Sequence, residues 1–458
     1  MPHDDVLLEI FDSYRELVSW HDAIWNWQKL LHVCRRWRYI ALASPRRLGL
    51  QIECNRRTPT RKLLDIWPPF PISISCYPWG SEGSTGNHNI FAALHRCDRI
   101  SQIDFSDITC TEVENFTAAM DEPFPVLTDL RVSTFEIAES AVMAELPDSF
   151  LGGSAPHLQS FVLEGAASPA LPNLVLSASH FQYLHLHSIP RAGYISPELM
   201  VTFLLALPNL KGLTIGFISP ESRPSQMRPP PLAHALLPSL TEFQFSGASE
   251  YLMDFIARID TPMLNSFQMI FFSDVIPNIS QLHKFINRTN RLKTFICAEV
   301  YFHHREVQAV FKSPANLGLD ITCGVSFSSW PLASMARLYE QLLTIPSQVE
   351  QLELCAEAWD ELDFSIDWWQ KDIDDSLWLR LLNPFVSVKS LYITRTLGPF
   401  VAYALKTLTG ESVTKVLPTL DNLFLEGFGS SEFVEETIKS FVSIRQLSGH
   451  PVFVRHWE

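Results

Sequence analysis

The chain has 458 residues, of which 47% are hydrophobic and 12% aromatic, and this composition excludes disorder over most of its length. Because 50 acidic side chains outnumber 35 basic ones, for a net charge of −15, the chain lacks the basic footprint of nucleic-acid-binding proteins, and we expect no nucleic-acid partner. No apolar run approaches the roughly 20 residues that span a bilayer, and the N-terminal MPHDDVLLEI is acidic where a signal peptide is basic, so we expect a soluble cytoplasmic or nuclear protein with no membrane partner.

The charge is distributed unevenly along the chain. Residues 1–65 carry 11 basic and 8 acidic side chains, a net charge of +3, whereas the remaining residues carry 24 basic and 42 acidic side chains, a net charge of −18. Such a step indicates two parts that meet different partners. We therefore expect a separate N-terminal module.

Two short amphipathic helices are predicted in that module. Residues 4–14 and 30–41 each carry an apolar stripe at helical spacing. Asp4 and Asp5 lie in the first turn of the first helix, where carboxylates favour the helix dipole. The second helix should end before Ser44-Pro45, because the residue before a proline disfavours helical backbone. Helices this short cannot enclose a core, so we expect their stripes to be buried against the rest of the chain, a partner, or both.

The same two segments carry a family resemblance. DDVLLEIFDSY followed by LLHVCRRWRYIALASPRRL resembles an F-box, and VCRRWR is its most specific part. The next segment, RTPTRKLLDIWPPFPISI, resembles the linker of a large fungal set of F-box proteins. Two departures stand out: the usual Leu-Pro positions fall on Pro2 and His3, and the interval from Phe11 to Cys34 is longer than in the compact motif.

The resemblance implies a partner for the module. An F-box docks onto the Skp-family adaptor of a cullin-based ubiquitin ligase, and an apolar helical surface too small to hide itself suits such a role. The alternative is that the stripes cap the first repeat of the following domain. The residues assigned to adaptor binding are Val6, Leu7, Ile10, Phe11, Leu31, Val33, Cys34 and Trp37.

From about residue 100 a short phrase recurs, with apolar residues at i, i+3 and i+5. Its copies follow one another at similar intervals, except for a gap about twice as long between Leu292 and Val349, which we assign to two units with a degenerate copy near Leu317 and Leu319. The i+3 and i+5 side chains share one face of an extended strand, and the residue at i packs from the preceding turn. The copies are Ile100/Ile103/Phe105, Leu127/Leu130/Val132, Leu158/Phe161/Leu163, Phe181/Leu184/Leu186, Leu210/Leu213/Ile215, Leu240/Phe243/Phe245, Leu264/Phe267/Met269, Leu292/Phe295/Cys297, Val349/Leu352/Leu354, Val388/Leu391/Ile393 and Leu420/Leu423/Leu425.

Helical stretches are predicted between the phrases, among them residues 252–259, 332–343 and 434–442. Strand, loop and helix that repeat at a regular interval predict an α/β fold, a β/α solenoid with a parallel sheet. Right-handed crossovers should place the helices on one side of that sheet. The competing interpretation is a set of ordinary βα units in a closed or doubly wound domain.

The repeat pattern resembles the leucine-rich repeat family. The resemblance implies a horseshoe over residues 100–458, after an F-box helical module at 1–48 and a linker with a first capping repeat at 49–99. The Asn or Cys that the family usually has just after the last strand leucine is replaced here, for instance by Ala166 and Ala248. We therefore expect irregular repeats.

Two segments interrupt the pattern. Residues 218–231 are rich in proline, and residues 77–89 are rich in glycine, serine and asparagine. Neither composition continues a helix or a strand. We expect both to be surface insertions.

Catalytic, metal-binding and cofactor motifs are absent from the sequence. The eight cysteines form no CxxC pair and no cluster with His at zinc-ligand spacing, so we expect reduced thiols and no metal. There is no GxxxxGK[ST], GxGxxG, HExxH or GxSxG. His303-His304 is interpreted as a solvated helix start. We expect a non-catalytic protein without a cofactor.

One segment is a candidate for substrate recognition. Residues 353–375 carry nine acidic side chains and one lysine, interleaved with aromatic residues. Tryptophan faces attract cations and carboxylates pair with them, so the segment suits a basic protein substrate. The alternative is a packed insertion whose charges only face water. The candidate residues are Trp359, Asp360, Phe364, Trp368 and Trp369.

Together these patterns predict the substrate-recognition subunit of a cullin-based ubiquitin ligase. The F-box would bind the Skp-family adaptor, and the repeats would bind a protein substrate. The alternative is a leucine-rich-repeat interaction scaffold that does not join a ligase.

Overall fold

The computed structural model divides the chain into two compact units, Met1–Tyr194 and Ile195–Glu458, which are described in turn. Its description covers residues 4–16, 32–43, 50–55, 58–67, 69–77, 87–135, 144–178, 180–219, 234–272, 279–303, 306–314, 318–324, 331–356, 375–408, 412–426 and 432–457.

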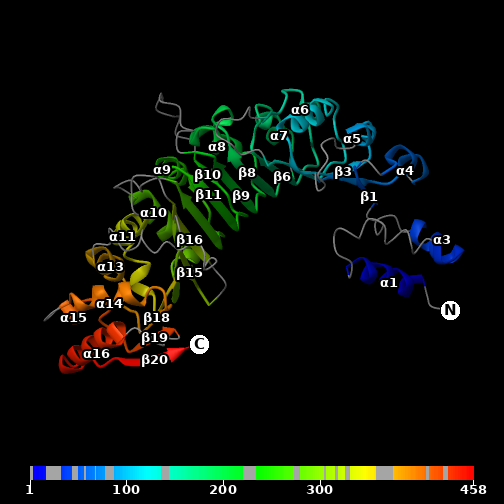
Figure 1. The fold of residues 1–458 in the computed structure, drawn as a ribbon. Helices are drawn as coiled ribbons and strands as arrows, with labels where there is room; N and C mark the ends of the chain where they lie inside the picture. The colour runs from blue at the N-terminus through cyan, green and yellow to red at the C-terminus, as the bar shows by residue number, and fades with distance from the viewer. Residues whose placement is uncertain are drawn as a thin grey trace. The chain divides into compact units, whose positions relative to one another are not determined.

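The first unit begins with two helices and continues as alternating strands and helices (Figure 1). One helix shows how the sequence sets a boundary. At the start of α6, the Thr109 hydroxyl accepts from the backbone N–H of Glu112, whose carboxylate accepts from the N–H of Thr109. The elements are α1 (Asp4–Glu16), α3 (Arg35–Ala43), β1 (Leu50–Glu53), α4 (Thr60–Ile66), β2 (Ile72–Cys76), α5 (Asn87–Leu94), β3 (Ile100–Ile108), α6 (Cys110–Ala118), β4 (Asp129–Thr134), β5 (Ala144–Glu145), η2 (Phe150–Gly153), β6 (Ser160–Glu164), β7 (Ala166–Ala167), α7 (Leu171–Ser177), β8 (Tyr183–Ile189) and η3 (Arg191–Gly193).

The sheet of the first unit is parallel throughout its described part. Strands β1, β2, β3, β4, β6 and β8 pair in that order. Their buried side chains are in register, so each strand adds to the same apolar layer. One such row runs Ile52, Ile74, Ile103, Leu130, Phe161 and Leu184.

The second unit continues the same alternation. In Figure 1 its helices all lie along one face of its sheet. We name the opposite face, which no described helix covers, the free sheet face. The elements are α8 (Pro197–Leu204), β9 (Gly212–Phe217), β10 (Ala235–Leu236), β11 (Glu242–Gly247), α9 (Ser249–Ile256), β12 (Ile259–Asp260), β13 (Ser266–Phe271), α10 (Ser280–Arg288), η5 (Asn290–Leu292), β14 (Cys297–Phe302), β15 (Glu306–Lys312), β16 (Gly318–Gly324), α11 (Pro331–Gln341), η6 (Pro346–Gln348), β17 (Gln351–Ala356), α13 (Asp375–Leu382), β18 (Ser390–Ile393), α14 (Gly398–Lys406), α15 (Ser412–Lys415), β19 (Asn422–Glu426), α16 (Glu432–Leu447) and β20 (Phe453–Trp457).

The sheet of the second unit departs from the all-parallel prediction at one place. Its main strands pair in the order β9, β11, β13, β16, β15, β14, β17, β18, β19 and β20. Strands β14, β15 and β16 form an antiparallel meander, so β14 pairs with β17 while β16 pairs with β13. The degenerate copy near Leu319 is therefore a true strand, and the long gap between Leu292 and Val349 contains β14, β15 and β16 rather than two parallel strands. Too few residues separate these strands in the sequence for the crossover that parallel neighbours require, which explains the reversal.

The apolar phrase predicts the buried face of nearly every strand. The three residues of ten of the eleven copies are buried, as predicted. The copy Leu292/Phe295/Cys297 is wrong in register, because β14 begins only at Cys297 and turns that thiol toward the free sheet face. Ala298 and Val300 are the buried side chains instead. The correct copy of the phrase is Phe295 at i, Ala298 at i+3 and Val300 at i+5. It is hard to recognise in the sequence because a small alanine stands at i+3, where the other copies have a larger apolar residue.

Three smaller sequence predictions are also corrected. The helix predicted over residues 30–41 is interrupted at Cys34, so α3 begins only at Arg35. Ile259 does not belong to the preceding helix, since α9 ends at Ile256 and Ile259 starts the short strand β12. His303 does not start a helix either. It lies in the turn between β14 and β15, where its N–H donates to the carbonyl of Glu306.

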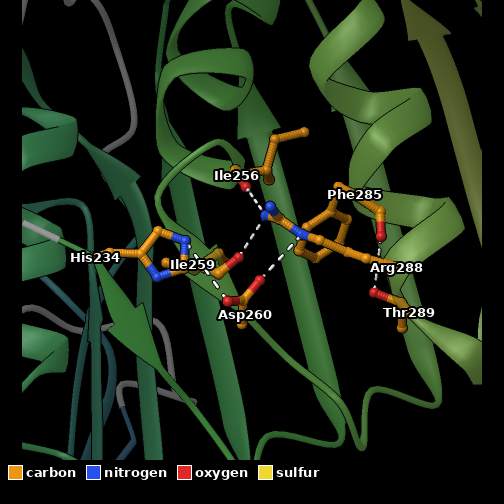
Figure 2. Close-up of polar contacts among 7 residues, drawn as sticks. All are labelled: His234, Ile256, Ile259, Asp260, Phe285, Arg288 and Thr289. Atoms are coloured by element: carbon orange, nitrogen blue, oxygen red, sulfur yellow. Dashed lines mark hydrogen bonds and ion pairs between the residues drawn. The ribbon is translucent and has the colours of Figure 1, made fainter.

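Buried or partly buried arginines connect successive repeats. Arg288, the last residue of α10, donates to the carbonyls of Ile256 and Ile259 at the end of the preceding repeat and forms an ion pair with Asp260 at 3.2 Å (Figure 2). The His234 ring lies 3.6 Å from the same carboxylate. The carbonyl of Ile256, the last residue of α9, lacks a partner within its helix, and the guanidinium from the next repeat supplies one.

The same arrangement recurs near both ends of the chain. Arg99 donates to the carbonyls of Phe70 at 3.1 Å and Leu64 at 3.5 Å. Arg445, which is completely buried, donates to four carbonyls of the preceding repeat. They belong to Val413, Val416, Leu417 and Pro418, at 3.1 to 3.3 Å.

Each unit is thus built of β/α repeats whose strands form a mostly parallel sheet and whose helices alternate with them. This is a leucine-rich-repeat-like β/α solenoid, as predicted, and not a closed or doubly wound domain. Doubly wound folds place helices on both faces of the sheet, which the arrangement of the second unit contradicts.

Candidate interaction surfaces

The N-terminal helices form a small core of their own, so the prediction that helices this short cannot enclose a core is wrong. Leu7 and Phe11 of α1 are buried together with Ile40 of α3. The Phe11 ring meets the half-buried Trp37 edge to face, with centroids 5.1 Å apart. Asp4 in the first turn of α1 forms an ion pair with Arg36 at 2.6 Å, which ties the two helices together at their polar edge.

The residues predicted for adaptor binding therefore separate into two groups. Leu7 and Phe11 hold the helix pair together and are not free to form a contact. Val6, Ile10 and Val33 are 46%, 44% and 58% exposed, and Cys34 is also exposed. Leu31 lies outside the described residues. The exposed apolar side chains are the part of the predicted set that can meet a partner.

The residues predicted for substrate binding all lie outside the described part of the structure. Strand β17 ends at Ala356 and α13 begins at Asp375. Trp359, Asp360, Phe364, Trp368 and Trp369 belong to the interval between them.

In the first unit, strand β8 carries a stack of three aromatic rings. Tyr183, His185 and His187 of β8 stack along one strand, with ring centroids 6.2 and 6.0 Å apart. Burial, and to a smaller extent the charge of Arg131 and that of His187 when it is protonated, lowers the pKa of His185 to about 4. Burial also lowers the pKa of His187. Both histidine rings are consequently neutral at physiological pH.

In the second unit, register aligns a row of side chains across the free sheet face. The paired residues are Glu299 of β14, Glu353 of β17, Tyr392 of β18, Phe424 of β19 and Arg455 of β20. The rings of Tyr392 and Phe424 stack with centroids 4.3 Å apart and planes 3° from parallel. The Arg455 guanidinium lies 5.8 Å from the Phe424 centroid, in a cation–π contact. We name these five residues the charged aromatic row.

Carboxylates dominate the β14 and β17 side of this row. Glu299 accepts from the Tyr301 hydroxyl at 2.7 Å and pairs with Lys312. Burial raises the pKa of the Cys355 thiol, and the nearby carboxylates of Glu353, Glu299 and Glu426 raise it further. A thiol that experiences three carboxylates marks a region of negative potential.

Across the described residues, no group of three or more His, Cys, Asp or Glu side chains is arranged to hold a metal ion. No described helix is both long enough and apolar enough to cross a membrane. The eight cysteines form no disulfide; Cys54, Cys76, Cys110 and Cys323 are buried.

Comparison with known proteins adds little to this description. No protein-family model matches the sequence, and no curated protein sequence matches it. Among solved structures, the chain is similar to the leucine-rich repeat-containing protein LegL7 from Legionella pneumophila, with 13% sequence identity. The match covers 88% of this chain and 99% of that protein, with a TM-score of 0.26. A likeness this weak supports no conclusion, so the fold class rests on the strand register and element order described above.

The charged aromatic row was missed by sequence reasoning. Glu353, Tyr392 and Phe424 each stand between the two strand residues of a phrase, at position i+4, but their side-by-side placement depends on strand order. Glu299 and Glu353 become neighbours only because the meander places β14 beside β17. A search for aromatic residues at position i+4 of successive copies could have found Tyr392 and Phe424.

Proposed function

We propose that this protein is a repeat-based scaffold that binds a protein partner on the free sheet face of its second unit. The observation that carries the proposal is the charged aromatic row, which presents stacked rings and charged groups on a face that no described helix covers. Aromatic and arginine side chains are the commonest anchors of protein interfaces. A rigid parallel sheet holds such anchors in fixed register, so little ordering is required when a partner binds.

Affinity capture with matched variants tests the scaffold function. Partners captured by the wild-type chain should be lost when Tyr392 and Phe424 are both replaced by serine, because the stacked anchors disappear. They should be retained by Glu242→Gln, an exposed substitution on β11 of the same sheet face. A set of captured proteins that is identical for all three chains would contradict the proposal.

A narrower function within this class is that of a ubiquitin-ligase substrate receptor. The F-box resemblance of the N-terminal segment supports it, and so does the exposure of Val6, Ile10 and Val33 on a helix pair that already has a core. The Skp-family adaptor would bind this surface and recruit a cullin. The chain itself would perform no chemistry; it would hold a substrate close to the charged ubiquitin carrier.

Co-purification with a Skp-family adaptor tests this narrower function. Replacing Val6, Ile10 and Val33 by serine should abolish adaptor binding while the helix content measured by circular dichroism stays unchanged, since these side chains are exposed. Arg38→Gln, on an exposed position of α3, serves as the control. If the wild-type chain does not bind the adaptor, the receptor function is wrong and the scaffold function remains.

A separate prediction concerns the acidic segment that follows β17. Replacing Trp368 and Trp369 by alanine should weaken substrate capture without affecting adaptor binding. Unchanged capture would refute a role for these residues.

A further inference from the structure

The charged aromatic row contains a pair of like charges on neighbouring strands. Glu299 and Glu353 are register partners on β14 and β17, an arrangement that is normally destabilising. Glu299 is compensated by Lys312 and by the Tyr301 hydroxyl. Within the described part of the chain, Glu353 forms no ion pair; its one described contact is the Cys355 thiol, 3.4 Å away. Lys312 forms its ion pair with Glu299 and acts on Glu353 only through its more distant charge, so two neighbouring carboxylates share one cation and negative charge remains concentrated at Glu353.

The neighbouring ring offers a second feature that attracts cations. Tyr392 and Phe424 stack face to face along the direction in which the strands succeed one another. On the far side of Phe424 lies the guanidinium of Arg455. The far side of Tyr392 is turned toward β17, where its register partner is Glu353. The β20 side of the stack therefore already holds a cation, whereas the β17 side presents an aromatic face next to a carboxylate.

We propose that the free sheet face binds a basic protein segment through an arginine side chain that lies between the carboxylate of Glu353 and the ring of Tyr392. An arginine fits better than a lysine, because its planar guanidinium can stack on a ring and donate two hydrogen bonds to a carboxylate. The additional carboxylate of Glu426, whose one described contact is the N–H of Arg395, lies at the same side of the sheet and favours further basic residues in the segment. Charge complementarity therefore favours a basic protein segment as the partner that occupies this face. The inference rests on the proposed scaffold function and names the chemistry of its partner.

Fluorescence anisotropy with the full chain tests this site. The probe is a fluorescein-labelled peptide of alternating arginine and serine, and the matched control peptide has glutamine in place of arginine. The wild-type chain should bind the arginine peptide and not the glutamine peptide. Affinity should fall as NaCl is raised from about 50 to about 300 mM, because salt screens the carboxylates.

Two substitutions locate the contact. Glu353→Gln keeps the side-chain size and should weaken arginine-peptide binding about tenfold, since a charge-assisted hydrogen bond is lost. Tyr392→Leu should weaken it about threefold through loss of the cation–π contact. The control Glu242→Gln removes one negative charge from the same face, far along the strand order, and should leave affinity within about twofold. Far-ultraviolet circular dichroism and urea unfolding confirm that each variant is folded.

The outcomes separate this site from the scaffold function. Equal binding of both peptides, equal loss in Glu353→Gln and Glu242→Gln, or no binding at millimolar peptide overturns the arginine site. If Tyr392→Ser/Phe424→Ser loses captured partners while Glu353→Gln retains them all, the scaffold function stands and the arginine site is wrong.

Discussion

At the scale of single residues, Arg445 shows how the repeats tolerate a buried charge. Its guanidinium is completely buried, and burial lowers its pKa. Four carbonyls of the preceding repeat accept from its two terminal nitrogens, and the face of Phe441 lies 5.7 Å away, whereas the buried Nε has no hydrogen-bond partner among the described residues. The carbonyls benefit as well: that of Leu417 also accepts from the Leu420 N–H, but those of Val413, Val416 and Pro418 would lose this donor if Arg445 were removed.

Arg445→Met should therefore lower the free energy of unfolding by about 3 kcal/mol, since methionine fills the space but leaves the carbonyls of Val413, Val416 and Pro418 without this donor. Urea unfolding measures the effect. Lys439→Met, on the exposed side of the same helix, should change stability by no more than about 0.5 kcal/mol. A small effect at Arg445 would mean that the carbonyls find water instead.

His185 predicts a pH dependence of stability. Burial lowers its pKa from 6.5 to about 4 in the folded chain. Between these values the unfolded chain binds a proton that the folded chain does not, so the free energy of unfolding falls as the pH falls through this window. His185→Gln removes this contribution. The wild type should therefore lose more stability than the variant between pH 6.5 and pH 4, as measured by urea unfolding. Parallel losses would show that His185 does not contribute.

At the scale of elements, strand β14 tests the corrected register. Val300 is buried against the helix side, whereas Cys297 is turned toward the free sheet face. Val300→Ala should cost about 2 kcal/mol of stability, from lost apolar burial and the cavity that remains. Cys297→Ser should change stability by no more than about 0.5 kcal/mol, because its side chain already meets solvent. The reverse order of effects would support the register Leu292/Phe295/Cys297.

At the scale of the whole molecule, the two proposed surfaces share no residue. Adaptor binding is assigned to α1, α3 and the residue Val33, and arginine binding to strands β17 and β18. Energies of contacts without shared partners normally add. Saturating adaptor should therefore change the dissociation constant of the arginine peptide by no more than about twofold in the anisotropy measurement. A larger change would reveal coupling between the two sites.

Part of the excess of acidic side chains is concentrated at one place in the structure. Residues 66–458 hold the whole negative excess. In the structure, part of that excess gathers around Cys355, where Glu299, Glu353 and Glu426 act on one thiol. The sequence-based expectation of a basic substrate rested on the segment that follows β17. The arginine site proposed on the charged aromatic row concerns the same class of partner but lies on described residues.

The sequence alone was sufficient to predict the repeat and most of the buried core residues. Phrases such as Leu210/Leu213/Ile215 are local patterns, and each reports which side of its own strand is buried. The start of α1 followed from an equally local signal, the carboxylates of Asp4 and Asp5 in its first turn. Local periodicity therefore determined the fold class, because every repeat meets nearly the same environment as the one before it.

Only the tertiary structure decided which strands pair and which side chains therefore become neighbours. The reversed meander of β14, β15 and β16 depends on which strand edges pair, and no single phrase carries that information. The same dependence on spatial order makes Glu299 and Glu353 neighbours and places Arg445 over carbonyls of the preceding repeat. Side-chain chemistry is local to the sequence, but a binding surface is a property of several strands together, so it appears only when their order is known.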